Sequence, residues 1–414
     1  MPGPDYAPIE DYGAIGDCHT AALISRWGSI DWYCPGRFDA APVFWRVLDA
    51  QRGGYFQVLP AGAKEAWRRY LPDTNILETT IGCEHGRLKL TDFMPIHRRQ
   101  SHRLGHDVGT THRIFRLLEA EEGACSAELR FKAVFNFGQT ETSLTMADGK
   151  GAVARAEGQC LALHSGKAQL KPAADGEVRG TIELEPGERT WLVLSFVSGE
   201  AAASNALAPD VSIRDLRRTA EYWETWATCC RYQGRYREQV VRSALTLKLL
   251  TYEPSGAAVA APTTSLPELI GGIRNWDYRF TWLRDASLSV YALGNLGYME
   301  EGSDFIEFLV GACKGDPSAK PQIMYRIDGS PEIEESVLAD LDGYKGSRPV
   351  RIGNGAYKQQ QLDIYGNVLA AAYHFHRRVE NAPETPDPAP SQRLSRRNWG
   401  LLCRLADQAA QDWQ

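Results

Sequence analysis

The hydrophobic pattern of the chain changes its period near Ser212, and this change limits the possible folds. Before it, short alternating or fully apolar segments such as 76–81, 88–93 and 190–196 are separated by turns rich in Gly and Asp. After it, residues 212–225 and 236–252 place apolar groups at helical spacing. Four later segments do the same, at 286–296, 303–312, 362–379 and 395–413. The pattern predicts an antiparallel β-sandwich followed by helices with long loops.

We expect three parts in a chain of 414 residues. Residues 1–210 are predicted to form a β-sandwich domain, 211–235 a helical linker, and 236–414 a helical domain. The proline-rich stretch 381–391 is predicted to be a surface loop. The alternation of helices and long loops suits helical hairpins arranged in a ring.

Charge and cysteine content exclude several classes of protein. The net charge of −6 argues against nucleic acid as a partner. The nine cysteines show no CxxC spacing, which favours reduced thiols in a cytoplasmic protein. The N-terminus has no basic region followed by an apolar one, and no apolar run is long enough to cross a membrane. We therefore expect a cytoplasmic protein that binds neither nucleic acid nor membrane.

The first candidate functional segment spans residues 273–285 and reads IRNWDYRFTWLRD. Surface loops favour Gly, Ser, Asn and Pro, and buried helices exclude unpaired charge, so this mixture fits neither. Flat aromatic faces beside carboxylates and guanidinium groups suit a polar, flat-faced ligand such as a sugar. Large aromatic residues, including the chain's eleven Trp, equally often fill cores.

Arg284 and Asp285 come immediately before a predicted helix that begins at Ala286. Asp285 is well placed to cap that helix. A cap does not require the aromatic residues Tyr278 and Trp282 nearby. An Arg beside an Asp can hold two sugar hydroxyls, one as acceptor and one as donor.

Two further loops are candidates for the rim of a pocket. Residues 260–268 contain two prolines, and a rigid connector is the simpler interpretation. Residues 343–366 combine several glycines with Arg348, Arg351 and Asn354, and the glycines allow backbone to approach a ligand closely. The order GxxxxGK[ST] of a phosphate loop is absent.

No classical catalytic or metal-binding motif occurs in the chain. Ser330-Pro331-Glu332 is typical of a helix start, so the acidic run 332–335 is predicted to be a solvated first turn. His374 and His376 are two residues apart, which is the wrong spacing for two ligands on one helix face. HExxH, GxSxG and dinucleotide-binding patterns are absent. The residues imply no metal and no organic cofactor.

Three segments resemble those of bacterial members of glycoside hydrolase family 15, the glucoamylase, glucodextranase and trehalase relatives. They read GAIGDCHTAALISRWGSIDWYCPGRFDAAPVF, AAPTTSLPELIGGIRNWDYRFTWLRDAS and GYKGSRPVRIGNGAYKQQQLDIYG, in the family's order. The resemblance implies an N-terminal β-supersandwich and a C-terminal (α/α)6 barrel. It also implies inverting hydrolysis of an α-linked glucose, in trehalose or in an α-1,4 or α-1,6 glucan.

The resemblance also implies roles for individual residues. Arg284 and Asp285 would hold the distal hydroxyls of the terminal glucose, and Tyr278 and Trp282 would form an aromatic wall. The other substrate-binding candidates that match the family's motifs are Asp277 in the same wall, Arg348 near the leaving group, and Asn354, Gln361 and Asp363.

The chain departs from the family pattern in its catalytic carboxyl groups. Inversion needs an acid and a base about 6.5–9.5 Å apart. In the family the acid follows Trp in a Gly-(Ile/Leu)-Trp-Glu run, and neither this run nor the pattern around the base occurs here. We therefore expect a C-terminally truncated chain with an incomplete barrel, its acid and base beyond Gln414, and little activity of its own.

Two alternatives remain open. A non-catalytic glucan-binding protein would also lack the acid and base. An inverting glycoside phosphorylase would need a phosphate site, to which Arg348 and Arg351 could contribute. The substrate linkage and the oligomeric state are left open.

Overall fold

The computed structural model describes residues 6–98, 108–147, 151–198, 212–313, 320–380 and 394–413. The chain divides into two compact units. The β unit comprises Met1–His97, Gly109–Glu224 and Leu341–Gly346. The helical unit comprises Arg98–Val108, Thr225–Asp340 and Ser347–Gln414.

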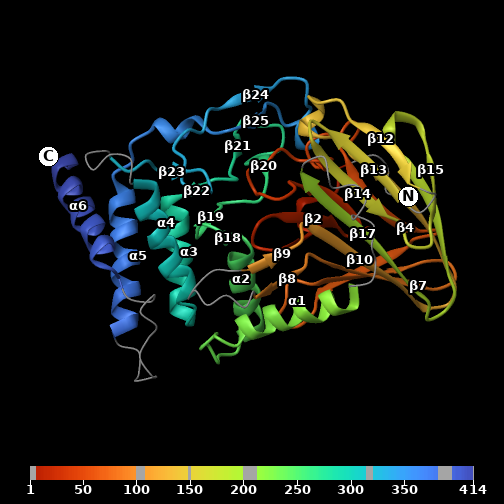
Figure 1. The fold of residues 1–414 in the computed structure, drawn as a ribbon, viewed down its shortest axis with the longest axis horizontal. Helices are drawn as coiled ribbons and strands as arrows, with labels where there is room; N and C mark the ends of the chain where they lie inside the picture. Colours follow the sequence, from red (N-terminus) through yellow and green to blue (C-terminus); the bar gives the residue numbers. More distant parts are fainter. Residues whose placement is uncertain are drawn as a thin grey trace. The chain divides into compact units, whose positions relative to one another are not determined.

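The β unit contains two antiparallel sheets within the described ranges (Figure 1). The seven-stranded sheet has the order β1 (Tyr12–Gly16), β2 (Ala21–Ser25), β3 (Ser29–Tyr33), β4 (Tyr55–Pro60), β11 (Cys125–Lys132), β16 (Val178–Leu184), β15 (Gln169–Pro172). The eight-stranded sheet has the order β12 (Ser143–Ala147), β13 (Gly151–Ala156), β14 (Gln159–His164), β17 (Arg189–Ser198), β10 (Arg113–Glu122), β7 (Arg87–Phe93), β6 (Leu77–Gly82), β5 (Glu65–Tyr70). Strands β8 (Ile96–Arg98) and β9 (Val108–Thr110) form a separate two-stranded sheet.

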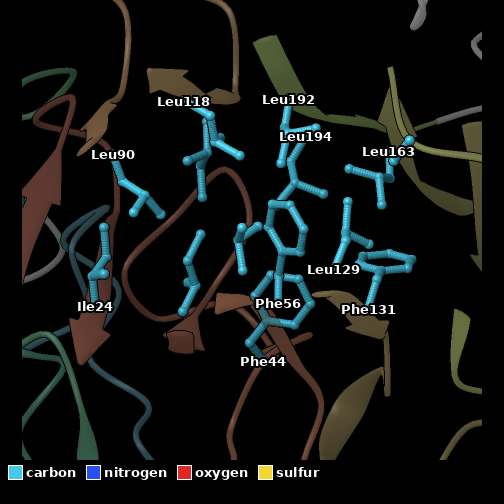
Figure 2. Packing of buried hydrophobic residues seen from close by; sticks show 14 of the residues in the cluster. Ile24, Phe44, Phe56, Leu90, Leu118, Leu129, Phe131, Leu163, Leu192 and Leu194 are labelled. Carbon is cyan, nitrogen blue, oxygen red and sulfur yellow. The ribbon is translucent and has the colours of Figure 1, made fainter. Parts of the chain in front are cut away.

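An extensive apolar core is built from side chains of both sheets. Phe56 of β4 and Leu129 of β11 belong to one sheet, and Leu118 of β10 and Leu192 of β17 belong to the other (Figure 2). All four side chains are fully buried. Side chains alternate across a strand, so on each strand the residue next to a core residue points to the outer face of its sheet. The prediction of an antiparallel β region followed by helices is confirmed.

Six α-helices lie in the described part of the chain after residue 211. They are α1 (Ser212–Ala227), α2 (Arg237–Leu249), α3 (Leu283–Leu296), α4 (Glu300–Ala312), α5 (Asp363–Glu380) and α6 (Arg396–Asp412). In the helical unit, α3 packs against α4 and α5, and α6 packs against α4 and α5. Each begins and ends within three residues of its predicted segment. No described helix is long and apolar enough to cross a membrane.

The helix predicted from the acidic run 332–335 is wrong. Residues 331–335 are irregular and lead into strand β24 (Ser336–Leu338), which pairs with β25 (Val350–Ile352). Glu332, Glu334 and Glu335 are exposed, so the predicted solvation is correct. Pairing with a distant strand outweighs the local helix-start signal. The predicted loop at 381–391 lies outside the described residues.

Short strand pairs occupy the loops between the helices. They are β18 (Thr251–Tyr252) with β19 (Ala257–Ala258), β20 (Thr264–Pro267) with β21 (Asn275–Asp277), and β22 (Thr281–Trp282) with β23 (Met324–Tyr325). The stretch 260–268, interpreted as a rigid connector, therefore contains a strand. Two of the candidate site residues lie in these pairs: Asp277 ends β21 and Trp282 ends β22.

Candidate functional site

Asp277 ends strand β21 and joins two segments that are far apart in the sequence. Its buried carboxylate accepts hydrogen bonds from Arg279 Nε at 2.9 Å, from Arg279 Nη2 at 2.7 Å and from the Gly353 N–H at 3.1 Å. Its carbonyl oxygen accepts a hydrogen bond from Asn354 Nδ2 at 3.0 Å. The segments 273–285 and 343–366, both singled out in the sequence, therefore meet at this residue.

Gly353 needs to be glycine at this junction. Its φ of 73° lies in the left-handed region, and a Cβ there would stand 1.8 Å from the carbonyl oxygen of Glu334. The close approach lets the Gly353 N–H reach the Asp277 carboxylate. The close approach at Gly353 is to neighbouring backbone, and the predicted approach of these glycines to a ligand stays a prediction.

Asn275 fixes the loop that carries Arg348. Its Nδ2 donates to the carbonyl oxygens of Gly272 at 3.1 Å and Ser347 at 3.0 Å. The Ser347 hydroxyl in turn accepts a hydrogen bond from the Gly271 N–H at 2.9 Å. Arg348 is exposed beside these anchored residues. Its position near residues 271–275 is therefore set by its neighbours.

Arg351 is committed to internal contacts. Its Nη1 donates to the carbonyl oxygens of Ile273 at 2.9 Å and Asn275 at 3.2 Å, and its Nε lies 3.2 Å from a carboxylate oxygen of Glu335. The guanidinium lies 4.4 Å from the centre of the Trp276 ring. Arg351 thus holds the loop in shape, and its charge is balanced by Glu335.

Tyr278 and Trp282 form an aromatic pair at the start of α3. Their ring centres are 6.1 Å apart and their planes are tilted by 45°. The Arg284 guanidinium lies 5.7 Å from the Trp282 ring, and its Nε is 3.7 Å from Asp285 Oδ1. The side chains of Arg284 and Asp285 are 41% and 39% exposed, whereas Trp282 is buried. The arrangement places a charged pair with accessible polar atoms beside an aromatic surface.

The two aromatic side chains differ in their polar groups. Burial raises the pKa of Tyr278, and the carboxylates of Glu268 and Asp285 raise it further, so its hydroxyl stays protonated. The Trp282 Nε1–H is buried and has no hydrogen-bond partner among the residues described. A buried donor without a partner destabilises the folded protein.

The prediction that Asp285 caps the helix is wrong. Helix α3 begins at Leu283, its N-cap is Trp282, and no side chain caps it. The pairing of Thr281 and Trp282 with β23 ends at this point and so sets the start of the helix. Asp285 lies in the first turn, where the helix dipole favours a negative charge.

The remaining candidate residues have local partners. Asn354 is buried, and its Oδ1 accepts a hydrogen bond from the Ala356 N–H at 3.1 Å. Gln361 Nε2 donates to Gln359 Oε1 at 3.1 Å. Asp363 begins α5 and is exposed. No hydrogen bond joins Gln361 or Asp363 to the segment 278–285 within the described ranges.

Sequence reasoning missed three residues at this site. Arg279 lies two positions after Asp277 and pairs with it. The Trp276 ring stacks against the Arg351 guanidinium, and the Glu268 carboxylate helps to raise the pKa of Tyr278, after the larger effect of burial. The sequence could have indicated Arg279, because a buried aspartate needs a cationic partner and Arg279 lies two positions from Asp277. The described part of the chain shows no group of three His, Cys, Asp or Glu side chains that could hold a metal ion.

Comparison with known proteins assigns both regions of the chain. The family described as glycosyl hydrolases family 15 matches residues 234–414, and the trehalase-like N-terminal family matches residues 1–223. The chain belongs to glycosyl hydrolase family 15. The resemblance inferred from the three sequence segments is therefore confirmed.

Several curated relatives of this family 15 chain are named trehalases. It is 35% identical to a trehalase of Thermoplasma volcanium, over 89% of this chain and 57% of that protein. It is 34% identical to one of Mycolicibacterium smegmatis, over 99% of this chain and 61% of that protein. It is 33% identical to a trehalase of Mycobacterium tuberculosis, over 99% of this chain and 60% of that protein. The chain spans about three fifths of the length of these relatives.

Proposed function

We propose that the whole protein containing these residues hydrolyses a terminal α-linked glucose with inversion, and that trehalose is its substrate. The observation that carries the proposal is the aromatic pair of Tyr278 and Trp282 beside the accessible charges of Arg284 and Asp285. Family membership supports the reaction class, and the names of the curated relatives favour trehalose over α-1,4 or α-1,6 glucans.

Each residue of the wall has a chemical role in this proposal. The Arg284 guanidinium donates to a sugar hydroxyl oxygen, and the Asp285 carboxylate accepts from a neighbouring hydroxyl. The Trp282 ring packs against the apolar face of the sugar. Tyr278 adds a protonated hydroxyl.

Asp277 and Asn354 act as positioning residues in the same proposal. Both are buried, and their polar atoms hold Arg279, Gly353 and Ala356. They keep the segment 343–366 against the segment 273–285. Arg348, Gln361 and Asp363 remain proposed contacts to the part of the substrate beyond the first glucose.

The general acid and base are proposed to lie outside these 414 residues. The helical unit is proposed to be the first part of an (α/α)6 barrel, to which helices of the longer protein would add. A missing acid or base each lowers the rate by about 10²–10⁴-fold. The chain alone is then expected to bind glucosides and turn them over very slowly.

The contacts of Arg351 bear on one of the two alternative functions, that of an inverting glycoside phosphorylase. An inverting phosphorylase needs free cationic groups for phosphate, and Arg351 is already occupied by two carbonyl oxygens and Glu335. This disfavours phosphorolysis. A purely glucan-binding role would use the same wall and differs only in the absence of turnover.

The test compares the longer protein, made from a gene that continues this sequence, with the chain of 414 residues. Release of glucose from trehalose, maltose and isomaltose is measured for both, with and without phosphate, and the product anomer is identified by proton NMR. We expect equal amounts of β-glucose, from the attacked unit, and α-glucose, from the leaving group, when the longer protein cleaves trehalose, and no cleavage by the chain of 414 residues. Retention of configuration or an absolute need for phosphate would overturn the mechanism, and absence of any cleavage would leave the binding role.

Arg284→Ala in the longer protein tests the site itself. We expect a loss of at least about 100-fold in kcat/KM for trehalose, because a charged hydrogen bond to the substrate is removed. Arg274→Ala is the matched control, since Arg274 is an exposed arginine of the same segment whose Nη1 lies 3.6 Å from Glu268. Equal losses in the two variants would contradict the assignment.

A further inference from the structure

The outer face of the seven-stranded sheet contains a large cavity within the β unit. Its volume is about 680 Å³. Phe56 and Val58 of β4 point into the sandwich core, so Tyr55 and Gln57 between them point to the outer face and line the cavity. Cavities of about 300–1,000 Å³ are typical of small-ligand sites.

A buried carboxylate at one end of the cavity holds two arginines in place. Glu177 is 5% exposed and accepts hydrogen bonds from Arg130 Nε at 2.8 Å and Arg179 Nε at 2.6 Å. It also accepts a hydrogen bond from the Tyr55 hydroxyl. Burial alone favours the neutral acid, but the hydroxyl and the two guanidinium groups hold the pKa of Glu177 below its ordinary value.

A second carboxylate network lies beside the first. Asp31 is 2% exposed and accepts hydrogen bonds from the Tyr12 hydroxyl at 2.8 Å and the Ser29 hydroxyl at 2.6 Å, and it pairs with Arg46 Nε at 2.9 Å. The Arg46 guanidinium lies 4.1 Å from the centre of the Tyr55 ring. Arg46 therefore connects the two networks, and the polar groups of this wall are held in fixed positions, as a preorganised binding surface requires.

The basic and acidic side chains that line the cavity are equal in number. Four side chains are basic and four are acidic: Arg46, Arg130, Lys132 and Arg179, and Asp11, Asp31, Asp175 and Glu177. An anion such as phosphate would gain no net attraction from such a lining. A neutral ligand with many hydroxyl groups can instead use both the donors and the acceptors.

Three side chains of the lining have polar groups without a partner. Within the described ranges, no hydrogen bond or ion pair engages the side chains of Trp27, Gln57 or Lys132, and all three line the cavity. Trp27 supplies a partly exposed indole ring, Gln57 supplies a donor and an acceptor, and Lys132 supplies donors. An aromatic face with free donors and acceptors is the set that a sugar ring needs.

The cavity continues along the sheet. A second hollow of about 540 Å³ shares Arg179 with the first and is lined by Gln169 and Lys171 of β15 and Thr181 of β16. Two adjoining hollows with mixed polar linings fit several linked sugar units better than one. A chain of glucose units is neutral and polyhydroxylated, and so meets both the charge balance and the length.

We propose that this outer face is a second carbohydrate-binding site, which takes a neutral α-glucan chain and contains none of the residues proposed to contact the terminal glucose. The choice of α-linked glucose as the sugar unit rests on the proposed function, whose substrate trehalose consists of α-linked glucose, and the choice of a chain rests on the length of the two hollows. The geometry and the balanced charge of the cavity do not depend on it. Binding here would hold a glucan to the protein apart from the site proposed for trehalose.

The test is affinity electrophoresis of the 414-residue chain in native gels that contain soluble amylopectin, with calorimetric titration of maltoheptaose. We expect retardation of the wild-type chain, and a loss of affinity of at least about tenfold in Trp27→Ala, since a central aromatic contact is removed. Trp67→Ala is the matched control, because Trp67 is a half-exposed residue of β5 in the other sheet. It should migrate as the wild type does.

Gln57→Ala keeps the proposal testable if Trp27→Ala proves unstable, because the Gln57 side chain has no described polar partner whose loss could unfold the sheet. We expect a weaker retardation of Gln57→Ala with an unchanged melting temperature. No retardation of the wild type, or equal retardation of wild type, Gln57→Ala and Trp27→Ala, would overturn the proposal.

Arg284→Ala separates this proposal from the proposed function. If amylopectin binding persists in Arg284→Ala and falls in Gln57→Ala, the second site is supported whatever the fate of trehalose cleavage. If binding is lost in Arg284→Ala and unchanged in Gln57→Ala, the second site is overturned while the terminal-glucose site stands.

Discussion

The β unit and the helical unit each bury an aspartate–arginine pair, and they use it differently. Asp92 and Arg116 are both fully buried, with Nε 2.7 Å and Nη2 3.1 Å from the two carboxylate oxygens. Asp277 and Arg279 are 0% and 4% exposed, with the same two-pronged contact. The chemistry is the same in the two pairs, so the difference lies in what else each pair holds.

The pair of the β unit connects the two sheets. Asp92 in β7 lies directly opposite Arg116 in β10, and Arg116 Nη1 reaches the carbonyl oxygen of Phe56 in β4 of the other sheet at 3.3 Å. The Asp277 pair joins residues only two apart, and its carboxylate also binds the Gly353 N–H. One pair therefore supports the sandwich core, and the other sets the conformation of the loops at the candidate site.

The largest effect should come from breaking the pair in the sandwich. Arg116→Met leaves the Asp92 carboxylate buried without its partner, so the free energy of unfolding should fall by about 3–5 kcal/mol. Urea unfolding followed by tryptophan fluorescence measures it. The double variant Arg116→Met with Asp92→Leu should recover most of the loss, because no charge is then left unpaired. A single variant within about 0.5 kcal/mol of the wild type would contradict the role of the pair.

Asp17 is a further buried aspartate, and among the described residues no arginine pairs with it. Asp17 accepts hydrogen bonds from the His19 and Thr20 N–H groups at 3.1 and 3.0 Å, and its Oδ2 has no partner among the described residues. Burial raises the pKa of Asp17 to about 7. The folded protein then holds a proton between about pH 4 and pH 7 that the unfolded chain releases, so stability falls as pH rises through this range.

Asp17→Asn should remove this part of the pH dependence, since Asn can accept the same two hydrogen bonds and does not ionise. Relative to the wild type, the variant should gain on the order of 3 kcal/mol between pH 4 and pH 8. Urea unfolding at a series of pH values measures the difference. The exposed Asp363→Asn is the control and should show no such gain. Parallel pH profiles of wild type and Asp17→Asn would show that Asp17 titrates normally.

Breaking the pair of the helical unit should have a smaller effect on stability and a clear effect on binding. Asp277→Asn keeps the volume and one acceptor, so we expect a loss of about 2 kcal/mol, below the cost of full removal. The weakened contact to Gly353 should also loosen the loop, so the affinity for trehalose should fall although Asp277 is buried. Thermal unfolding and calorimetric titration test both effects. Unchanged affinity with lowered stability would confine Asp277 to a structural role.

The smallest effect should come from the proposed contact surface. Tyr278→Phe removes one hydroxyl without emptying the site, so affinity for trehalose should fall severalfold, equivalent to about 1 kcal/mol, with stability unchanged. Tyr291→Phe is the control, because Tyr291 is an exposed tyrosine of α3 outside the proposed wall. Calorimetric titration of trehalose into the wild type, Tyr278→Phe and Tyr291→Phe measures the three affinities. Equal affinities would remove Tyr278 from the proposed wall.

Local patterns predicted the helices well and the loops poorly. Apolar spacing located α3 and α5 because a helix buries one continuous stripe of its own residues. The same kind of local signal failed at 331–335, where pairing of β24 with β25 overrides it. It also misplaced the start of α3, because the strand pair of β22 and β23 ends at Trp282.

The amino-acid sequence was enough to predict the family, the order of a β region and a helical region, and the short segment that contains Tyr278, Trp282, Arg284 and Asp285. These features depend on residues that are neighbours in the chain. The three-dimensional structure was needed to show that Asp277 binds Gly353, that Arg351 has internal partners, and that outward side chains of several strands line one cavity. Those contacts join residues tens of positions apart, and no local periodicity encodes which distant partner satisfies a buried charge.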